Sequence, residues 1–266
     1  MGLIAEPTRP RSSPQAADVY VFLSLACAIT WLLDLPAAFA TLAHRPLSPG
    51  ALAMAGLGAF GPTLAALVVA GYRRELVSVF GRWHTSALSV ALALLSVPAL
   101  HLVATLTYAA LGGTPERWFY PPEKPEHFAA LVVFAIGEEF GWRGYAYPRL
   151  AERHGPVVGS LLVGVVWTFW HFFMWFTDDG PPSLLTLTRG MVELCLASLV
   201  MAWWFERGRR SMAIAIAFHA GAHLDNTMRA SDGEARLQVL RMLAWCVMGG
   251  LAAYGLSKAE AKDAAS

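Results

Sequence analysis

Long apolar stretches alternate with short connections rich in Gly, Pro and charged residues along the whole chain. Each stretch is near the ~20 residues that a helix needs to cross the hydrocarbon core of a bilayer. The connections are too short to hold a separate soluble domain, and no internal repeat is visible. The pattern predicts an all-α fold, a single bundle of about eight transmembrane helices, at Val19–Leu42, Ala51–Tyr72, Ala87–Leu111, His127–Pro148, Val157–Phe176, Leu184–Phe205, Met212–Met228 and Leu237–Leu256.

Composition supports the same class of protein. Hydrophobic residues make up 56% of the chain and charged residues 15%, with a mean hydropathy of +0.47. A soluble domain has about 45–50% apolar and about 25% charged residues, so we predict a polytopic membrane protein with the lipid bilayer as its first partner. The net charge of +1 gives no sign of a nucleic-acid partner, and we expect none. Cys27, Cys195 and Cys246 lie in separate apolar segments without CxxC spacing, which is typical of small buried hydrophobes.

The two ends of the chain are expected to lie outside the bundle. Residues 1–18 are polar and contain Arg9, Arg11 and several Pro and Ser, which predicts a disordered tail. Residues 19–257 are expected to form one domain, and residues 258–266 a second short tail. A cleaved signal peptide is the alternative for the N-terminus, because Ala38-Phe39-Ala40 resembles a cleavage site. The long apolar run and the long tail before it argue against cleavage.

The charges of the connections predict the orientation in the membrane. With the N-terminus inside, 12 Lys and Arg residues fall on the cytoplasmic side, around Arg74, Arg153 and Arg209, and 6 fall on the other side, around Lys124 and Arg189. Cytoplasmic loops carry the excess of basic residues, so we expect both termini in the cytoplasm. Lys is rare beside Arg, a composition typical of a GC-rich bacterial genome, so the expected location is a bacterial cell membrane.

Two adjacent carboxylates and an arginine stand at membrane depth in the fourth segment. Each such charge costs roughly 2.5–3.5 kcal/mol to insert at a helix centre, so a sequence seldom carries three without a use for them. Glu139 and Arg143 are four residues apart and can pair. Glu138 points about 100° away from Glu139 and is left free. These three residues predict a catalytic site. The alternatives are an ion pair that joins helices and part of the ion path of a transporter.

Two further apolar segments carry polar residues. His171 ends Trp167-Thr168-Phe169-Trp170-His171 in the fifth segment, where a lone histidine is more often a satisfied core residue than a ligand. His219, His223 and Asn226 share one face of the seventh segment. The alternative for that face is an interhelical hydrogen-bond cluster.

All three polar clusters are expected to face the bundle interior, because membrane helices hide polar groups from lipid. Two glutamates and up to three histidines would then meet in one place. Glutamate and histidine side chains in one place can activate a water molecule by general base catalysis and stabilise an oxyanion. A three-ligand zinc site is the other arrangement that these residue types allow, with the ligands Glu138, His171 and His219.

The three clusters, in this order, resemble the motifs of the CPBP family of intramembrane proteases, also called the Abi or CAAX-protease family. That family carries EExxxR, then FxxxH, then HxxxN or HxxxD, on separate transmembrane helices. Here the motifs read Glu138-Glu139-Phe140-Gly141-Trp142-Arg143, Trp167-Thr168-Phe169-Trp170-His171 and His219-Ala220-Gly221-Ala222-His223. The resemblance covers about residues 55–228 and includes a Gly61-Pro62 pair. Two positions depart from it: Trp167 replaces the Phe, and His223 replaces the Asn or Asp.

The resemblance implies a role for each matching residue. Glu138 would act as general base on a water that His171 also holds. His219, with His223, would stabilise the tetrahedral oxyanion. Because His223 departs from the motif, Asn226 from one turn further along is the alternative donor.

Glu139 and Arg143 would pair and orient their helix. Members of the family have been described both as metalloproteases and as metal-independent glutamate proteases. A zinc ion (Zn²⁺) is therefore the possible cofactor, held only in the metal-dependent case by Glu138, His171 and His219.

The resulting hypothesis is an intramembrane endopeptidase that cuts a membrane-embedded or membrane-proximal peptide. A proton-coupled transporter and a catalytically inactive scaffold are the alternatives. The counted depths of the three motif residues in the membrane do not agree with one another. Counted from the cytoplasmic ends at 1.5 Å per residue, Glu138 lies about 15 Å deep, His219 about 11 Å and His171 about 21 Å. The fifth helix must therefore start late, tilt or kink for His171 to reach the other two.

Overall fold

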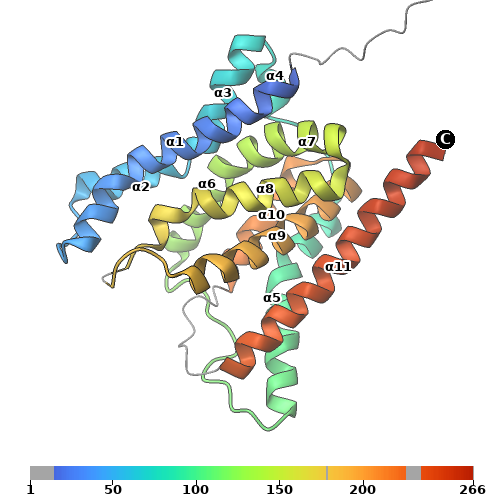
Figure 1. The fold of residues 1–266 in the computed structure, drawn as a ribbon. Coiled ribbons are helices and arrows are strands. Elements are labelled where there is room, and N and C mark those ends of the chain that lie inside the picture. The colour runs from blue at the N-terminus through green and yellow to red at the C-terminus, as the bar shows by residue number, and fades with distance from the viewer. Residues whose placement is uncertain (1–14, 178, 226–234, 266) are drawn as a thin grey trace, which may run out of the picture.

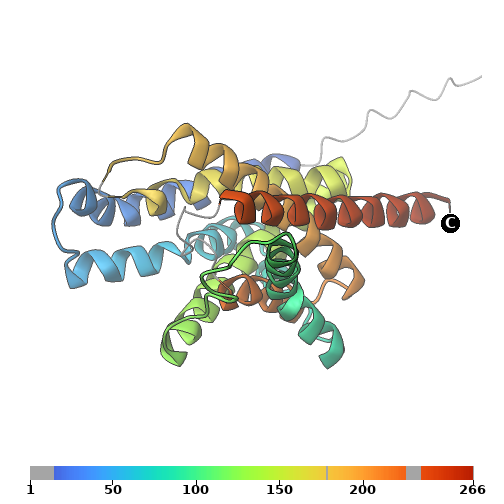
Figure 2. The ribbon, with the colours of Figure 1, turned by 90° about the horizontal axis from the view of Figure 1, so that it is seen from below.

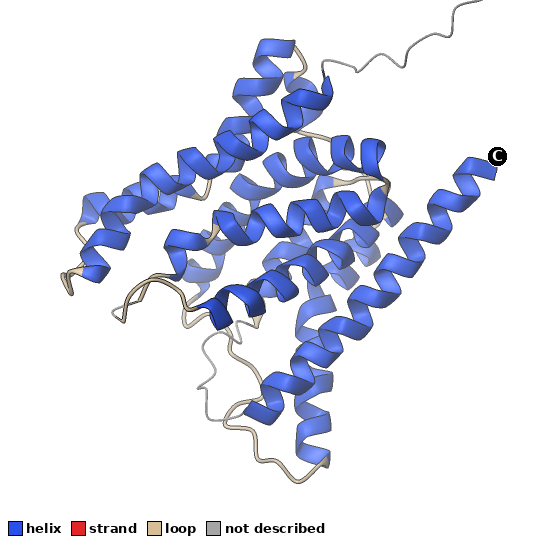
Figure 3. Cartoon of the chain, viewed as in Figure 1, coloured by secondary structure: helices blue, strands red, loops and turns tan. Residues whose placement is uncertain are grey.

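The computed structural model describes residues 15–177, 179–225 and 235–265, which contain helices and connections but no β-strand (Figures 1 and 3). The predicted all-α fold is therefore confirmed. The helical elements in chain order are α1 (Gln15–Leu42), α2 (Pro49–Gly58), α3 (Gly61–Arg73), α4 (Leu76–Val79), α5 (Ala87–Ala110), α6 (Pro125–Gly141), the π-helical turn η1 (Trp142–Ala146), α7 (Tyr147–His154), α8 (Pro156–Trp170), the 3₁₀ turn η2 (Phe172–Trp175), α9 (Leu184–Arg207), α10 (Met212–Leu224) and α11 (Ala235–Ala265).

Several of these helices can cross a membrane. Among the described residues, four helices are long and apolar enough on their own, within α1, α5, α9 and α11. The α2–α3 pair passes the same test together, although it is bent by 52°. α8 and α10 are apolar but shorter, and α6, η1 and α7 follow one another without a break. The chain is a polytopic membrane bundle, and the exact count of eight spans stays a prediction.

Some helix ends differ from the sequence prediction. The fourth segment continues through Pro148 to His154, because Pro148 stands in the first turn of α7, where its missing N–H is not needed. The fifth segment ends at Trp170 instead of Phe176, since the chain turns there into η2. α11 runs on through residues 258–265, which were expected to form a tail. Residues 226–228, the expected end of the seventh segment, lie outside the described residues.

The helices that carry the three motifs lie inside the bundle. In Figure 1, α1, α2 and α3 run along one side, α5 and α11 along the opposite side, and α6, α8, α9 and α10 between them. α10 packs against α5 and α6, α8 against α9, and α3 against α6. Because α6, α8 and α10 are covered in this way, their polar residues are screened from lipid, as the membrane environment requires.

The two ends of the described chain lie on the same side of the bundle. α1 begins and α11 ends at the upper right of Figure 1, near the turn between α7 and α8. Figure 2, seen from below, shows the C-terminal part of α11 extending past the other helices in that direction. An even number of membrane crossings would place both ends on one side of the membrane, and this topology stays a prediction. Which side faces the cytoplasm still rests on the loop charges.

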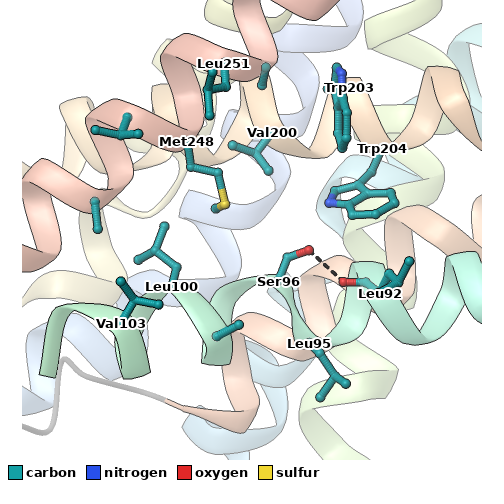
Figure 4. A pocket seen from close by; sticks show the side chains of 14 residues that line it. Leu92, Leu95, Ser96, Leu100, Val103, Val200, Trp203, Trp204, Met248 and Leu251 are labelled. Carbon is teal, nitrogen blue, oxygen red and sulfur yellow. Dashed lines mark hydrogen bonds between the residues drawn. The ribbon is translucent and has the colours of Figure 1, made fainter. Parts of the chain in front are cut away.

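An apolar groove of about 720 Å³ lies between α5, α9 and α11 (Figure 4). Leu100 and Val103 of α5 face Met248 and Leu251 of α11 across it. The lining contains a single hydroxyl, on Ser96, which donates to the Leu92 carbonyl oxygen at 2.7 Å. Because no titratable side chain lines this groove, it offers no chemistry for hydrolysis, and the candidate active site lies elsewhere.

Candidate active site

α6 brings two glutamates into the bundle because small residues let it approach α3 closely. A Cβ atom on Gly141 would overlap the backbone of Pro62, and one on Gly137 would lie 2.8 Å from the Phe60 ring. The Thr63 hydroxyl donates to the Gly137 carbonyl oxygen at the same contact. The start of α3, with its Gly61-Pro62 pair, therefore determines where the following turn of α6 lies. Glu138 is 5% exposed there and Glu139 is fully buried.

Glu139 holds side chains from two helical elements. Its Oε1 atom accepts from Arg143 Nη1 at 3.3 Å, so the predicted pair four residues apart is confirmed. The same oxygen lies 2.8 Å from His219 Nδ1 on α10, which donates to it. Arg143 also donates to the Ser198 hydroxyl of α9 at 3.3 Å, and Ser198 donates to the Ser160 carbonyl oxygen of α8. Glu139 thus connects α6 and α10, and Arg143 extends this network to α9 and α8.

Glu138 has a partner that the sequence reading missed. The indole Nε1–H of Trp167, on α8, donates to Glu138 Oε2 at 2.8 Å. The other carboxylate oxygen, Oε1, lies 3.9 Å from His219 Nε2. The expectation that Glu138 is left free is therefore wrong for one of its oxygens. The signal in the sequence was the Trp that replaces Phe in the second motif, since only Trp has an N–H to donate.

His171 stands at the end of α8, where the helix gives way to η2. Its Nδ1–H donates to the Trp167 carbonyl oxygen at 2.8 Å, which leaves Nε2 available. The ring packs edge-on against Trp170 and stacks on Trp175, with ring centroids 4.8 and 5.5 Å away. The His171 ring also lies 5.8 Å from the Trp167 ring, which the His219 ring meets at 5.3 Å, so both histidines pack against Trp167. α8 begins at Pro156, so the depth counted for His171 hardly changes. The fourth segment, however, extends to His154, which makes the counted depth of Glu138 greater and closer to that of His171.

His223 lies beside His219 on α10, with ring centroids 5.1 Å apart, so the predicted shared face is confirmed. Direct contacts therefore join five of the six predicted site residues, Glu138, Glu139, Arg143, His219 and His223, and His171 is linked to them through Trp167. Asn226, the alternative donor, lies outside the described residues.

The side chains proposed as zinc ligands are committed to other partners. His219 Nδ1 donates to Glu139, His171 Nδ1 donates to the backbone, and Glu138 Oε2 accepts from Trp167. Within the described part of the chain, no three His, Cys, Asp or Glu residues lie in a group that could hold a metal ion. Each of the three side chains keeps a second donor atom, Glu138 Oε1, His171 Nε2 and His219 Nε2, but in the described residues they do not lie together as a metal-binding group. The described arrangement therefore does not fit a zinc ion, and no step below passes through one.

A second group of buried polar residues lies apart from the motifs, and we name it the α5–α11 cluster: His101, Tyr120, Asp225, Arg241 and Trp245. The Tyr120 backbone N–H donates to Asp225 Oδ1 at 2.7 Å, and His101 Nδ1 lies 3.3 Å from Asp225 Oδ2. Trp245 packs edge-on against His101, and Arg241 lies over the Tyr120 ring. Arg241 and Trp245 stand four residues apart on α11, and the other three residues come from three separate segments, so no spacing in the sequence indicates the whole cluster.

Comparison with known proteins shows which families the sequence is similar to. Residues 124–224 match the family described as type II CAAX prenyl endopeptidase Rce1-like. Over 156 residues the chain is 26% identical to CAAX prenyl protease 2 of Methanococcus maripaludis, a match that covers 54% of this chain and 57% of that relative. The chain therefore spans little more than half the length of the relative. The family match extends from before Glu138 to just beyond His223, so it includes all three motifs.

Proposed function

Because residues 124–224 belong to the CPBP, or CAAX protease-like, family, we propose that this chain is an intramembrane endopeptidase. Its substrate would be a membrane-embedded or membrane-proximal protein or peptide, and residues 19–257 would form the protease domain. The observation that carries the proposal is the position of His219 between two buried carboxylates. One ring nitrogen lies 2.8 Å from Glu139, and the other lies 3.9 Å from Glu138.

Glu138 is the general base of the proposed reaction. A water hydrogen-bonded at ~2.8 Å to both Glu138 Oε1 and His219 Nε2 fits between atoms that are 3.9 Å apart. Glu138 would take a proton from this water while the water oxygen bonds to the carbonyl carbon of the peptide. When the carbon–nitrogen bond breaks, Glu138 would return the proton to the leaving amine. The carboxylate then begins the next cycle unchanged.

The histidines have complementary tasks in this scheme. Because Glu139 accepts from His219 Nδ1, it fixes the orientation of the ring and balances the charge of an imidazolium, in the way a carboxylate does beside a catalytic histidine. A protonated His219 can donate from Nε2 to the developing oxyanion, and His223 beside it is the second donor. His171 keeps Nε2 available to accept from the attacking water.

Arg143 makes this arrangement possible at membrane depth. Its side chain is 1% exposed and interacts directly with Glu139. Without a cation, two adjacent carboxylates in the bundle interior would repel each other and lose their solvation. Arg143 thus offsets the charge of Glu139 and lets Glu138 work as a base.

Glu138→Gln tests the proposal directly, because the amide has nearly the same shape but cannot take a proton. Purified wild-type and variant proteins in nanodiscs would be given a farnesylated CAAX peptide and the same peptide without the lipid, since the relative is named for that substrate class. Membrane peptides that accumulate in cells carrying Glu138→Gln would be identified in parallel by mass spectrometry. Glu126→Gln, at the exposed start of the same helix, is the matched control.

We expect cleavage by the wild type and by Glu126→Gln, and none by a folded Glu138→Gln. Cleavage by Glu138→Gln at the wild-type rate would remove Glu138 as the base. If the wild type cleaves neither probe and no peptide accumulates in cells, the scaffold alternative replaces the protease.

A further inference from the structure

Trp167 is the one motif residue whose type differs from the family pattern and whose side chain contacts the proposed base. It stands on α8 and is 4% exposed. The family motif has Phe at this position, which can fill the same space but has no N–H. The Trp167 indole donates to Glu138 Oε2 at 2.8 Å, well within the range of a strong hydrogen bond to a carboxylate.

This bond determines which oxygen of Glu138 is available for chemistry. Among the described residues, the Glu138 side chain has this single hydrogen bond, and it occupies Oε2. Oε1 is then the oxygen that faces His219 Nε2, at 3.9 Å. If the carboxylate turned about its last torsion, which is soft for Glu, neither oxygen would have a fixed direction.

The indole ring is itself held in place from several sides. The Arg143 guanidinium carbon lies 5.0 Å from the centre of the ring, an attractive cation–π arrangement. The His219 ring meets it edge-on with centroids 5.3 Å apart, and the His171 ring is 5.8 Å away. Trp167 therefore contacts a residue from each of the three motifs, and its N–H cannot rotate away from Glu138 without losing these contacts.

We infer that Trp167 is a positioning residue that directs Glu138 Oε1 toward His219 by binding Oε2. The inference rests on the proposed function, since it concerns how the base of that reaction is oriented. It also assigns a purpose to the departure from Phe: in this chain an N–H has become part of the hydrolytic site.

Two replacements of Trp167 separate the hydrogen bond from packing. Trp167→Phe restores the residue of the family motif and removes both the N–H and part of the ring. Replacing Trp167 with 3-benzothienylalanine keeps the fused-ring shape and substitutes sulfur for the N–H. Trp31→Phe is the matched control, because Trp31 also donates an indole N–H to α8, to the Phe169 carbonyl oxygen at 3.1 Å. Among the described residues, no hydrogen bond, ion pair or ring contact joins Trp31 to Glu138, His171 or His219.

The kinetic test uses a fluorogenic farnesylated CAAX peptide with protein in nanodiscs, after thermal unfolding has shown that each variant is folded. We expect kcat to fall roughly 10- to 100-fold in both Trp167 replacements, the range for a lost hydrogen bond to a charged group, while KM stays within about threefold. Trp31→Phe should keep kcat within about twofold. Wild-type kcat for the benzothienylalanine protein would overturn the inference and leave the proposed function intact, because packing alone would then suffice.

A second measurement needs no substrate. In protein labelled with ¹⁵N at tryptophan, the indole signal of Trp167 is the one lost in Trp167→Phe. Glu138→Gln should move that signal more than the signal of any other indole, because its hydrogen bond then ends on a neutral amide. A Trp167 signal that stays in place would overturn the inference even if the wild type cleaves no probe.

Discussion

The two buried polar clusters of this bundle differ in the kind of contact that their carboxylates make. In the motif cluster, which consists of Glu138, Glu139, Arg143, Trp167 and His219, each carboxylate is contacted by side chains from other elements. In the α5–α11 cluster, Asp225 instead accepts the backbone N–H of Tyr120, a residue in the connection before α6. The contacts of the motif cluster orient side chains toward one another. Those of the α5–α11 cluster attach a connecting segment to the bundle.

This difference between the two clusters indicates that the burial of charged side chains alone does not identify a reactive site. Asp225 is 1% exposed and His101 is 4% exposed, as deeply buried as Glu138 at 5%. What distinguishes the motif cluster is a second carboxylate that fixes the histidine, so that its remaining nitrogen faces the base. In the α5–α11 cluster, Asp225 contacts His101 and accepts a backbone hydrogen bond from the segment before α6, which suits a structural role. Variants in each cluster should therefore affect different properties.

The largest expected effect is on catalysis by Glu138→Gln. Loss of a general base typically costs about 10²–10⁴ in rate, so cleavage of a probe peptide should fall by that factor. The Trp167 N–H can still donate to the amide oxygen, so the variant should unfold at nearly the wild-type temperature. A variant that loses folding together with activity would make Glu138 a structural residue like Asp225.

Glu139→Gln should lower both stability and the cleavage rate, because it leaves the Arg143 guanidinium without the Glu139 carboxylate as its charge partner. Removing one partner of a buried ion pair costs roughly 3–5 kcal/mol, so the unfolding midpoint should fall clearly. Cleavage by the folded fraction should also fall, since His219 loses the carboxylate that holds Nδ1. Denaturant titration together with cleavage assays measures both. Unchanged stability would show that the Glu139–Arg143 contact contributes no net energy.

Variants of His223 test whether this side chain donates a hydrogen bond to the oxyanion. His223→Leu should lose about 10²–10³ in kcat, the cost of one oxyanion donor. His223→Asn restores the residue of the family motif and should keep most of the activity. Asn226→Ala is the companion variant: near-normal activity leaves His223 as the donor, and a large loss moves the role to Asn226. If His223→Leu and Asn226→Ala are both silent, the α10 face holds no donor beyond His219.

Asp225→Ala should give the opposite pattern to Glu138→Gln. It removes the acceptor of the Tyr120 N–H and the partner of His101, which should cost about 1–3 kcal/mol of stability. The folded fraction should cleave at the wild-type rate, because Asp225 contacts none of the motif residues. Unfolding in detergent and the rate per folded molecule are the two readouts. A selective loss of kcat would place Asp225 within the catalytic arrangement after all.

The smallest expected effect is that of metal removal. Because no group of three His, Cys, Asp or Glu residues in the described part of the chain could hold a metal ion, we expect a chelator such as EDTA to leave the cleavage rate within about twofold of the untreated rate. Activity that disappears with the chelator and returns with Zn²⁺ would show that these side chains rearrange to bind a metal ion, and would favour the metal-dependent branch of the family.

Features that depend on one helix were predictable from the sequence. Apolar length predicted the long helices α1, α5, α9 and α11, and the spacing of four residues predicted both the Glu139–Arg143 pair and the shared face of His219 and His223. Within a helix, 3.6 residues per turn fix which side chains are neighbours, whatever the rest of the fold does. The ends of α8 and α11 were predicted less well, because apolar composition does not show where a helix stops.

Contacts between helices were decided only by the tertiary structure. The approach of Gly141 to Pro62 sets how α6 lies on α3, and with it which His219 nitrogen meets Glu139 and which oxygen of Glu138 meets Trp167. The α5–α11 cluster depends in the same way on segments that are far apart in the chain. No spacing in the sequence encodes these contacts, because they depend on the packing of several helices at once, and a shift of one helix by a single ångström would change the hydrogen-bond partners.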